Sequence, residues 1–503
     1  MKKTIFCVFI LCIIVCHQTC SRAADSVAKS GVRKSILAGS WYEGSKAGLT
    51  RQVDRYLDAA PTPGSGNRIG AVIAPHAGYE WSGSTAAYGY QPLKGAQYKR
   101  VIVLAPSHRT SFRGGSICDV AAYETPLGEV SLDRAVCDAL LSSSLVQSLP
   151  QAHAQEHSLE IQLPFLQRTL GEFSLIPIVI GDISPGDCVE LANLIRPLLT
   201  QDTLLVMSSD FTHQGPRFGY VPFKEDVRKN VQRLDFVAIN SILNLNVREF
   251  WAFTDRVQAT ICGKNSIKIG MMALPLQTQV EFLHYETSGD KQKDYSETVS
   301  YAAIIFRDQP DYLNEREAEL LLNIARKTLT DTLEAKDVKE YTPPNEQITP
   351  PLRQKKGVFV TLQKEGMLRG CIGDLDAEQE LHKTVARTVL LSALRDQRFQ
   401  PVQKEELEKI DIEISVMSPQ TTVNSWKEIV LGRDGIIVEK GGRSALYLPQ
   451  VALEQGWDVE ETLSHLCEKA RLDKDAWKSG CTFKTFSAQV FGETFNQLNE
   501  DTK

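Results

Sequence analysis

Short apolar runs alternate with amphipathic stretches between residues 33 and 306. The runs at 70–74, 100–105, 173–180 and 203–209 are mostly apolar and rich in aliphatic and β-branched side chains, and weaker runs lie at 116–121 and 298–306. Continuous apolar runs are typical of strands buried on both faces, as in parallel sheets. Stretches with helical character occur at 46–58, at 223–243, at 267–276 and after Asp133. This alternation predicts an α/β fold with a mostly parallel sheet flanked by helices.

A different pattern occupies the last part of the chain. It predicts helices at 313–333, 381–394 and 459–470, a hairpin with strands at 357–362 and 367–373, and further strands at 410–416, 435–439 and 445–448. A chain of 503 residues is too long for one hydrophobic core. We therefore expect a first domain at 33–306, a linker at 307–312 and a smaller α+β domain at 313–495.

The first 24 residues have the pattern of a secretory signal peptide. Lys2 and Lys3 precede an apolar stretch at 4–16, and small residues stand before a cleavage point after Ala23. The apolar stretch is short for a membrane span. We expect export to a periplasmic or other extracytoplasmic compartment. Lipidation at Cys16 or Cys20 is the second alternative, and an uncleaved anchor is the third.

Charge and cysteine content narrow the function classes. The formal net charge is −6, so no global basic field favours nucleic-acid binding. Membrane contact is expected only if the protein is lipidated. Of the 11 cysteines, those beyond the leader are seven in number and show no Cys-x-x-Cys spacing. This excludes a disulfide framework, a zinc ribbon and an iron–sulfur cluster as the organising feature.

Histidines stand just beyond the ends of several predicted strands. His76 follows the first apolar run, His108 follows the next, and the run at 203–209 leads to Asp210 and His213. His157, between Glu156 and Glu160, stands at the head of another apolar stretch. Ligands of open α/β sheets bind beyond the carboxyl ends of the strands. One such histidine would most often be structural, but the repeated placement favours a shared site for a metal or a proton.

Two histidines and one anionic ligand can hold a metal ion with open coordination positions. His76 and His108 supply the histidines, and the anion candidates are Asp210, Glu156, Glu160 and Cys262. Cys262 stands at the predicted start of a helix, where exposed N–H groups stabilise a thiolate. His157 or His213 would then serve proton transfer. Asp210 and His213 would share one face if their stretch opened a helical turn.

Residues 33–306 resemble the Memo family. The resemblance rests on six ordered motifs: Ser40-Trp41-Tyr42, Pro75-His76-Ala77-Gly78-Tyr79, Pro106-Ser107-His108, the stretch from Glu156 to Gln162, the stretch from Ser208 to His213, and Cys262-Gly263. It implies a fold similar to class III extradiol dioxygenases and one metal ion bound through His76, His108 and Cys262. The expected catalytic residues around it are Asp210, His157 and His213.

We expect the metal to be iron or copper and the function to be that of an oxygenase-like oxidoreductase. Its substrate would be a small or peptide-borne aromatic or reduced compound. A cysteine in place of the usual dioxygenase carboxylate changes ligand softness and redox potential, which argues against simple ring cleavage. The alternatives are a non-catalytic protein that binds a metal, a peptide or another ligand on a dioxygenase-like fold, and a copper-handling protein.

Residues 313–495 resemble the AMMECR domain family. The motifs are Leu368-Arg369-Gly370-Cys371-Ile372-Gly373, Arg398-Phe399-Gln400-Pro401, the stretch from Leu446 to Ala452, and Gly456-Trp457. Arg369 and Cys371 are candidates for a second site, and a tight hairpin with a buried cysteine is the structural alternative. Together the two domains resemble AmmeMemoRadiSam system proteins B and A joined in one chain, which implies a separate radical-SAM protein as a partner.

Overall fold

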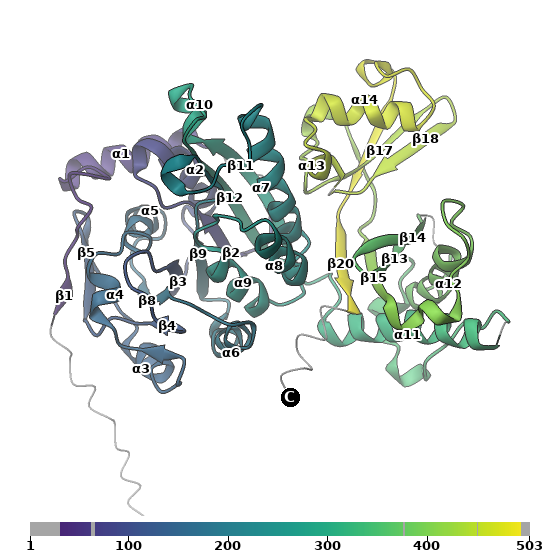
Figure 1. Ribbon diagram of the computed structural model, residues 1–503, viewed down its shortest axis with the longest axis horizontal. Coiled ribbons are helices and arrows are strands. Elements are labelled where there is room, and N and C mark those ends of the chain that lie inside the picture. The colour runs from purple at the N-terminus through teal and green to yellow at the C-terminus, as the bar shows by residue number, and fades with distance from the viewer. Residues whose placement is uncertain (1–30, 62–65, 336, 376–377, 450, 494–503) are drawn as a thin grey trace, which may run out of the picture.

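The computed structural model describes residues 31–61, 66–335, 337–375, 378–449 and 451–493. The expected leader at 1–24 lies outside these ranges. Figure 1 shows a larger domain, coloured purple to teal, and a smaller one, coloured green to yellow. Among the described helices, none is both long and apolar enough to cross a membrane. The cysteines in these ranges form no disulfide.

A large mixed, mostly parallel sheet forms the centre of the first domain. Within the described residues it has nine strands, which run β10-β12-β2-β9-β3-β8-β4-β7 with β11 paired to β12. The strands are β2 (Ile69–Ala74), β3 (Arg100–Pro106), β4 (Gly115–Ser116), β7 (Val146–Gln147), β8 (Ser174–Ile180), β9 (Thr203–Ser208), β10 (His213–Gln214), β11 (Thr278–Thr287) and β12 (Thr298–Asp308). The central strands β2, β9, β3 and β8 are parallel. This confirms the predicted fold class.

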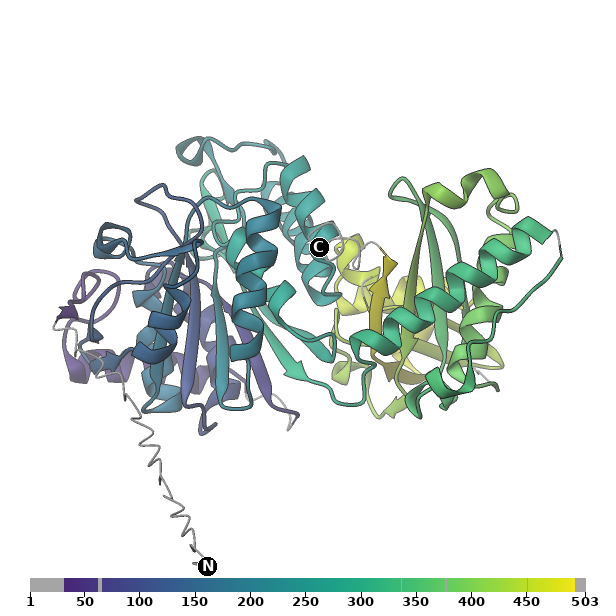
Figure 2. The same cartoon turned by 90° about the horizontal axis from the view of Figure 1, so that it is seen from below.

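Helices cover both faces of this sheet, as Figure 2 illustrates. The helices of this domain are α1 (Lys46–Ala59), α2 (Tyr79–Tyr90), α3 (Arg134–Leu140), α4 (Pro150–Ala154), α5 (Leu163–Leu170), α6 (Pro185–Ile195), α7 (Val227–Leu243), α8 (Val247–Arg256), α9 (Lys264–Ala273) and α10 (Ser288–Gln292). α2 packs on β2 and β12 beside α1 and α5, whereas α9 packs on β3 and β9 beside α6 and α8. Every residue of β2 and β9 is buried as a result.

Several sequence expectations for this domain were wrong in detail. The expected strand at 116–121 is interrupted because Val120 N donates to Cys118 O at 3.0 Å in a tight turn. The next strand, β5 (Ala122–Thr125), instead joins β1 (Val32–Arg33) and β6 (Gly128–Ser131) in a small separate sheet. The expected helix at 223–243 begins only at Val227. β12 continues through Asp308, so the first two residues of the expected linker belong to a strand.

The second domain is α+β and contains two four-stranded sheets. The first has the order β14-β13-β15-β20, and the second β16-β19-β17-β18. The strands are β13 (Val358–Lys364), β14 (Met367–Asp374), β15 (Ile410–Met417), β16 (Thr421–Val423), β17 (Gly435–Lys440), β18 (Arg443–Tyr447), β19 (Thr482–Phe486) and β20 (Ala488–Gly492). The helices are α11 (Glu315–Ala335), α12 (Leu381–Leu394), α13 (Val451–Gln455) and α14 (Val459–Lys469). α11 and α12 pack on the first sheet, and α14 packs against β18.

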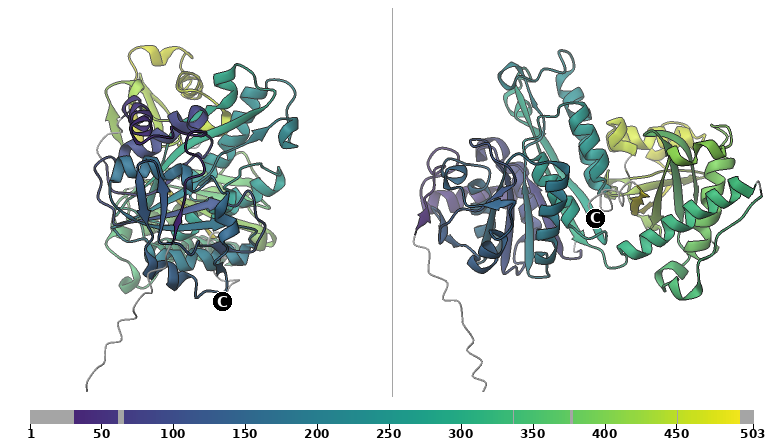
Figure 3. Two further views of the ribbon diagram at one scale, coloured as in Figure 1. Left: turned by 90° about the vertical axis from the view of Figure 1, so that its left-hand side faces the viewer. Right: turned by 60° about the horizontal axis from the view of Figure 1, so that its bottom comes forward.

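The two domains contact each other directly. α13 of the second domain packs against α7 of the first, and the right-hand view of Figure 3 shows these two elements side by side. On β20, the Gln489 side chain donates to Leu276 O at 3.3 Å and to Leu313 O at 2.7 Å, and it accepts from Leu313 N at 2.7 Å. One buried amide therefore ties the end of the second domain to the junction between the domains.

Candidate metal centre

The predicted site residues of the first domain converge beyond the carboxyl ends of neighbouring strands. His76 follows β2, Asp210 follows β9 and His108 follows β3, and these three strands are adjacent in the sheet. Cys262 stands just before α9, which packs on β9 and β3. His157 lies between α4 and α5, and its ring centroid is 4.4 Å from that of His108.

Two groups of side chains in the described part of the chain have ligand atoms close enough to hold a metal ion. One contains His76, His108 and His157, and the other contains His76, Asp210 and Cys262; within each, the ligand atoms lie within 4.8 Å of one another. The predicted set of His76, His108 and Cys262 is thus divided between two groups that share His76. His213 belongs to neither group.

His76 is the buried centre of this arrangement. Its Nδ1 lies 2.9 Å from Ser208 Oγ, and its Nε2 lies 3.0 Å from Cys262 Sγ. Its backbone N donates to Asp210 Oδ1 at 2.7 Å. Burial, assisted by the neighbouring His108 and His157, lowers the pKa of His76 well below its ordinary value. The ring is therefore neutral near pH 7, as a metal ligand must be.

Glu156 orients His108 and is not itself in either ligand group. Its Oε1 lies 2.9 Å from His108 Nδ1, and its Oε2 accepts from His108 N at 2.7 Å. Burial alone would raise the pKa of Glu156, but the hydrogen bonds from His108 and from backbone N–H groups lower it to about 2. An ionised carboxylate only accepts, so His108 Nδ1 carries the proton and Nε2 is left with a lone pair.

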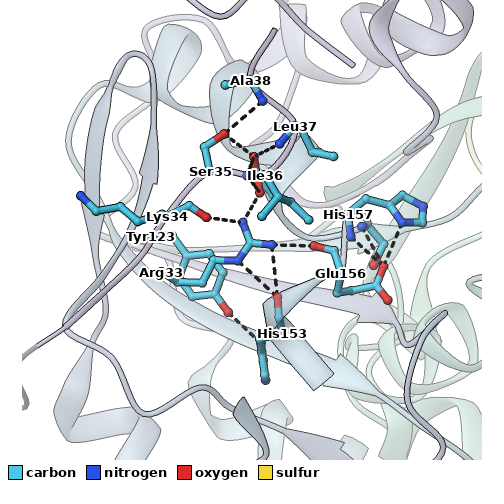
Figure 4. A network of polar contacts seen from close by, with 12 residues as sticks. Arg33, Lys34, Ser35, Ile36, Leu37, Ala38, Tyr123, His153, Glu156 and His157 are labelled. Carbon is cyan, nitrogen blue, oxygen red and sulfur yellow. Dashed lines mark hydrogen bonds and ion pairs between the residues drawn. The ribbon is translucent and has the colours of Figure 1, made fainter. Parts of the chain in front are cut away.

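Glu160 has a structural role, which removes it from the candidates for the anionic ligand. The Arg33 guanidinium pairs with Glu160 Oε2, and both side chains are buried. Tyr42 OH donates to Glu160 Oε1 at 2.6 Å and Ser35 Oγ donates to it at 2.7 Å. Figure 4 shows Arg33 between this segment and the backbone carbonyls of His153 and Glu156. The ion pair between Arg33 and Glu160 therefore fixes residues 33–42 against the loop that carries His157.

Cys262 lies close to the end of β9 because the next residue is glycine. A Cβ on Gly263 would lie 2.3 Å from Ser208 O, so a larger residue would push the start of α9 away. Asp210 N donates to Cys262 Sγ at 3.2 Å. Burial, followed by the Asp210 carboxyl, raises the pKa of the Cys262 thiol well above its ordinary value. A thiolate here therefore needs a nearby cation, which fits a metal ligand.

His213 does not share a helical turn with Asp210, so that expectation was wrong. His213 opens the short strand β10, which pairs with β12. Its Nδ1 lies 2.9 Å from Phe211 O and 3.0 Å from Thr260 O. Backbone carbonyls, rather than the Asp210 carboxylate, fix its tautomer with the proton on Nδ1. Burial raises the pKa of Asp210, and its Oδ1 is engaged by His76 N.

Sequence reasoning missed the roles of three residues near this centre. Ser208 Oγ contacts His76 Nδ1 directly. Gln162 reaches His76 only through the Ser208 hydroxyl, to which its amide donates. Trp41 is 37% exposed, and its ring centroid lies 4.7 Å from that of His157. All three lie in or beside motifs that carry the family resemblance, but only the hydrogen-bond geometry assigns their contacts.

Arg369 and Cys371 lie together on β14 in the second domain. Arg369 forms two hydrogen bonds with the Glu406 carboxylate, each 3.0 Å long. The Cys371 thiol accepts from Thr361 Oγ1 at 3.3 Å, and burial raises its pKa. Between them, a Cβ on Gly370 would lie 2.3 Å from Ser392 O, so the motif glycine allows α12 to pack on β14. These contacts explain the motif as structure, and a second site there remains a prediction.

Comparisons with known proteins agree with this two-part architecture. Residues 33–305 match the family model described as Memo-like protein, and residues 322–491 match the model described as AMMECR1. A MEMO1 family protein of Nitrosopumilus maritimus is 32% identical over 284 residues, which is 55% of this chain and 99% of that protein. The memo-1 homolog of Caenorhabditis elegans is 31% identical over 56% of this chain and 83% of its own length. Human MEMO1 is 29% identical over 54% of this chain and 96% of its own length.

One solved structure is also similar to part of the chain. It is the crystal structure of an uncharacterized protein from Pyrococcus horikoshii, which is 37% identical. The match covers 36% of this chain and 94% of that protein, with a TM-score of 0.34.

Proposed function

Because the chain belongs to the Memo family through residues 33–305 and carries an AMMECR1 domain at 322–491, we propose that it is a metal-dependent, oxygenase-like oxidoreductase. His76 Nε2, His108 Nε2 and Cys262 Sγ would hold one iron or copper ion. The observation that carries this proposal is the 3.0 Å separation of Cys262 Sγ from His76 Nε2, the ring nitrogen that Ser208 leaves available. Thiolate and imidazole together suit iron and copper better than magnesium or calcium.

The bound metal would supply a redox-active Lewis acid. The residues around it would bind the substrate and move protons. Burial and the nearby His108 lower the pKa of His157 to about 4, so its imidazole is neutral near pH 7 and can accept a proton only as a weak base. His213 has Nε2 available for the same task, because its Nδ1 is held by carbonyls.

One partly exposed aromatic side chain near the candidate metal ligands supports the proposed substrate class. Trp41 is partly exposed next to His157. A planar aromatic group can stack on such a ring while its polar substituent approaches the metal. This supports a small or peptide-borne aromatic or reduced compound as substrate.

Metal analysis tests the proposed ligands. Full-length protein is loaded anaerobically with Fe(II) or Cu(I), desalted and analysed for metal. We expect His76→Ala and His108→Ala to lose the ion, because each removes a neutral imidazole ligand. His465→Ala, at a position in the second domain far along the chain from the site, is the matched control and should retain it. Full occupancy in both site variants rejects the proposal.

A second candidate function is metal or ligand binding without turnover. The feature that favours it is the thiol at a position where extradiol dioxygenases use a carboxylate, because soft thiolate stabilises Cu(I). Oxygen uptake with catechols and other reduced aromatics separates the two functions. Uptake that depends on the bound metal supports the oxidoreductase. Tight Cu(I) binding without uptake or product supports the binding protein.

The cellular setting is proposed from the family resemblance and the leader pattern. The joined domains support a place in an AmmeMemoRadiSam system with a separate radical-SAM protein as partner, which co-purification from the source cells tests. The leader pattern supports export. A native protein that begins at Met1 and is found only in the cytosol would reject export, and an added lipid mass on Cys16 or Cys20 would indicate a lipoprotein.

A further inference from the structure

We propose that a relay of buried hydrogen bonds, which runs from Gln162 through Ser208 and is oriented by the backbone carbonyls of Ala74 and Pro75, fixes the proton of His76 on Nδ1 and turns the Nε2 lone pair toward Cys262. Ser208 and Gln162 would thus be positioning residues for the metal centre. The tautomer follows from the hydrogen bonds of this chain alone, whereas its consequence for metal binding rests on the proposed function.

The first step is the orientation of the Gln162 amide. One end of the amide lies 3.0 Å from Pro75 O and 3.4 Å from Ala74 O, and the other end lies 2.7 Å from Tyr90 OH. Backbone carbonyls only accept hydrogen bonds, so the end that faces them must be the NH₂ group. The Gln162 oxygen therefore faces Tyr90 and accepts from its hydroxyl.

The second step is the direction of the Ser208 hydroxyl. Gln162 Nε2 donates to Ser208 Oγ at 2.7 Å, while Ser208 Oγ lies 2.6 Å from Ser158 O. A hydroxyl has one hydrogen and two lone pairs. Its hydrogen must go to the Ser158 carbonyl, and Gln162 uses one lone pair. One lone pair remains.

The third step assigns the proton of His76. The remaining Ser208 lone pair faces His76 Nδ1 at 2.9 Å. This contact is a hydrogen bond only if Nδ1 carries the hydrogen. The other tautomer would set two acceptors against each other in a place without water, because Tyr90, Gln162, Ser208 and His76 are each at most 1% exposed. Nε2 therefore keeps its lone pair, 3.0 Å from Cys262 Sγ.

The relay predicts different effects for two similar variants. Ser208→Ala removes the acceptor of the Nδ1 proton, so both tautomers of His76 become accessible. Tyr90→Phe removes a buried hydroxyl that donates to the far end of the Gln162 amide, and the Pro75 and Ala74 carbonyls still orient Gln162. It is therefore the matched control for the loss of a buried hydrogen bond. Ser208→Thr keeps the hydroxyl and should restore the wild-type tautomer.

The experiment has a spectroscopic arm and a metal arm. Full-length, metal-free protein is labelled with ¹⁵N-histidine, the His76 signals are assigned by their loss in His76→Gln, and two-bond ¹H–¹⁵N correlations report which nitrogen is protonated. We expect Nδ1–H in wild type, Tyr90→Phe and Ser208→Thr, and added Nε2–H in Ser208→Ala. In the metal arm, Co(II) is titrated and its thiolate charge-transfer band is followed. We expect about 10- to 100-fold weaker binding only in Ser208→Ala.

The outcomes separate this inference from the proposed function. Nε2–H in the wild type overturns the relay, as does an unchanged tautomer in Ser208→Ala. If Ser208→Ala does not fold, the wild-type spectrum and Ser208→Thr still decide. Wild-type protein with Nδ1–H that binds no Co(II) supports the relay and contradicts the metal function. Wild-type protein that binds Co(II) through thiolate but shows Nε2–H contradicts the relay alone.

Discussion

His108 Nδ1 lies 2.9 Å from Glu156 Oε1, and the backbone N of the same histidine donates to Glu156 Oε2 at 2.7 Å. One carboxylate therefore fixes both the backbone and the ring of a candidate metal ligand. Glu156 also accepts from Ser158 N at 3.0 Å, so its own position is held by the loop that follows it. This is the carboxylate–histidine pairing that raises the basicity of metal-bound imidazoles.

Replacing Glu156 by glutamine should weaken metal binding without removing a ligand. The amide is not a charged acceptor for His108 Nδ1, so the His108 ring is held less firmly and its Nε2 is less basic. We expect an affinity loss of about 10- to 100-fold for Co(II) or Fe(II), measured by titration. Glu129→Gln, at an exposed position of β6, is the control. Equal affinity in both variants would show that Glu156 does not support the metal.

Breaking the buried pair between Arg33 and Glu160 should destabilise the first domain. Glu160→Gln leaves a buried guanidinium without its counter-charge, which typically costs about 3–5 kcal/mol. Urea unfolding monitored by far-UV circular dichroism measures the change. The control is Glu124→Gln, which breaks the exposed pair with Lys34 and should change stability little, because solvent screens that pair. Similar losses in the two variants would contradict the structural role assigned to Glu160.

The pattern of the chain predicted the parallel core and the place of the histidines for a physical reason. Continuous apolar runs need cover on both faces, and the residues that follow such strands gather at one edge of the sheet. β11 was not predicted, because its sequence mixes polar and apolar residues without a clear period and most of its side chains are only half-buried. β19 and β20 were missed too, and their pairing partners lie far back along the chain.

The roles of the site residues were harder to predict than their positions. Glu156 and Glu160 look alike in the sequence, yet one orients His108 and the other pairs with Arg33, 127 residues away. No local pattern records a partner so distant. The role of Ser208 depends on which neighbours donate and which accept, and this information exists only in the folded arrangement.

Stability should fall in mild acid because of His153. Its Nδ1 lies 2.7 Å from Tyr123 OH and its Nε2 lies 3.0 Å from Ser116 Oγ. Burial, assisted by Arg33, lowers its pKa from 6.5 to about 4. Between these values the unfolded chain binds a proton at His153 that the folded chain does not. The contribution of neutral His153 to the free energy of unfolding is therefore fully present above pH 6.5 and is lost as the pH falls toward 4.

The expected loss from this one group is on the order of 3 kcal/mol. Urea midpoints measured between these pH values in wild type and His153→Gln check it. The variant should be less stable near neutral pH, where Tyr123 and Ser116 have lost their partner, but its stability should depend less on pH. The same pH slope in both proteins would assign the acid sensitivity to other groups.

Cys371 should react slowly with alkylating reagents. Burial raises the pKa of its thiol and outweighs the opposite effect of the hydrogen bond that Thr361 Oγ1 donates to the sulfur at 3.3 Å, so little thiolate is present near pH 7. Peptide-level mass spectrometry after timed treatment with iodoacetamide measures the rate, with an unstructured peptide of the same sequence as the reference. A rate faster than that of the peptide would indicate an activated thiol and support a second site at Arg369 and Cys371.

His213→Ala should retain the metal and lose the proton-transfer chemistry. The side chain belongs to neither group of candidate ligands in the described residues. Its Nδ1 proton is held by Phe211 O at 2.9 Å and Thr260 O at 3.0 Å, so Nε2 can act as a base without a change of tautomer. A general base typically contributes a factor of about 10² to 10⁴, and we expect turnover to fall by that amount.

Metal content and turnover must be measured in the same His213→Ala preparation, once a substrate is identified by oxygen uptake. His284→Ala provides the control, because this histidine stacks on Tyr88 and belongs to neither group of candidate ligands in the described residues. Unchanged turnover in His213→Ala would reject the base role and leave proton transfer to His157. Loss of the metal itself would make His213 a ligand. His76 belongs to both candidate groups, and one of them also contains Asp210 and Cys262. If His213 were a ligand, we would expect the ion to be held by this second group, and His108 would be the residue to test for displacement from the metal.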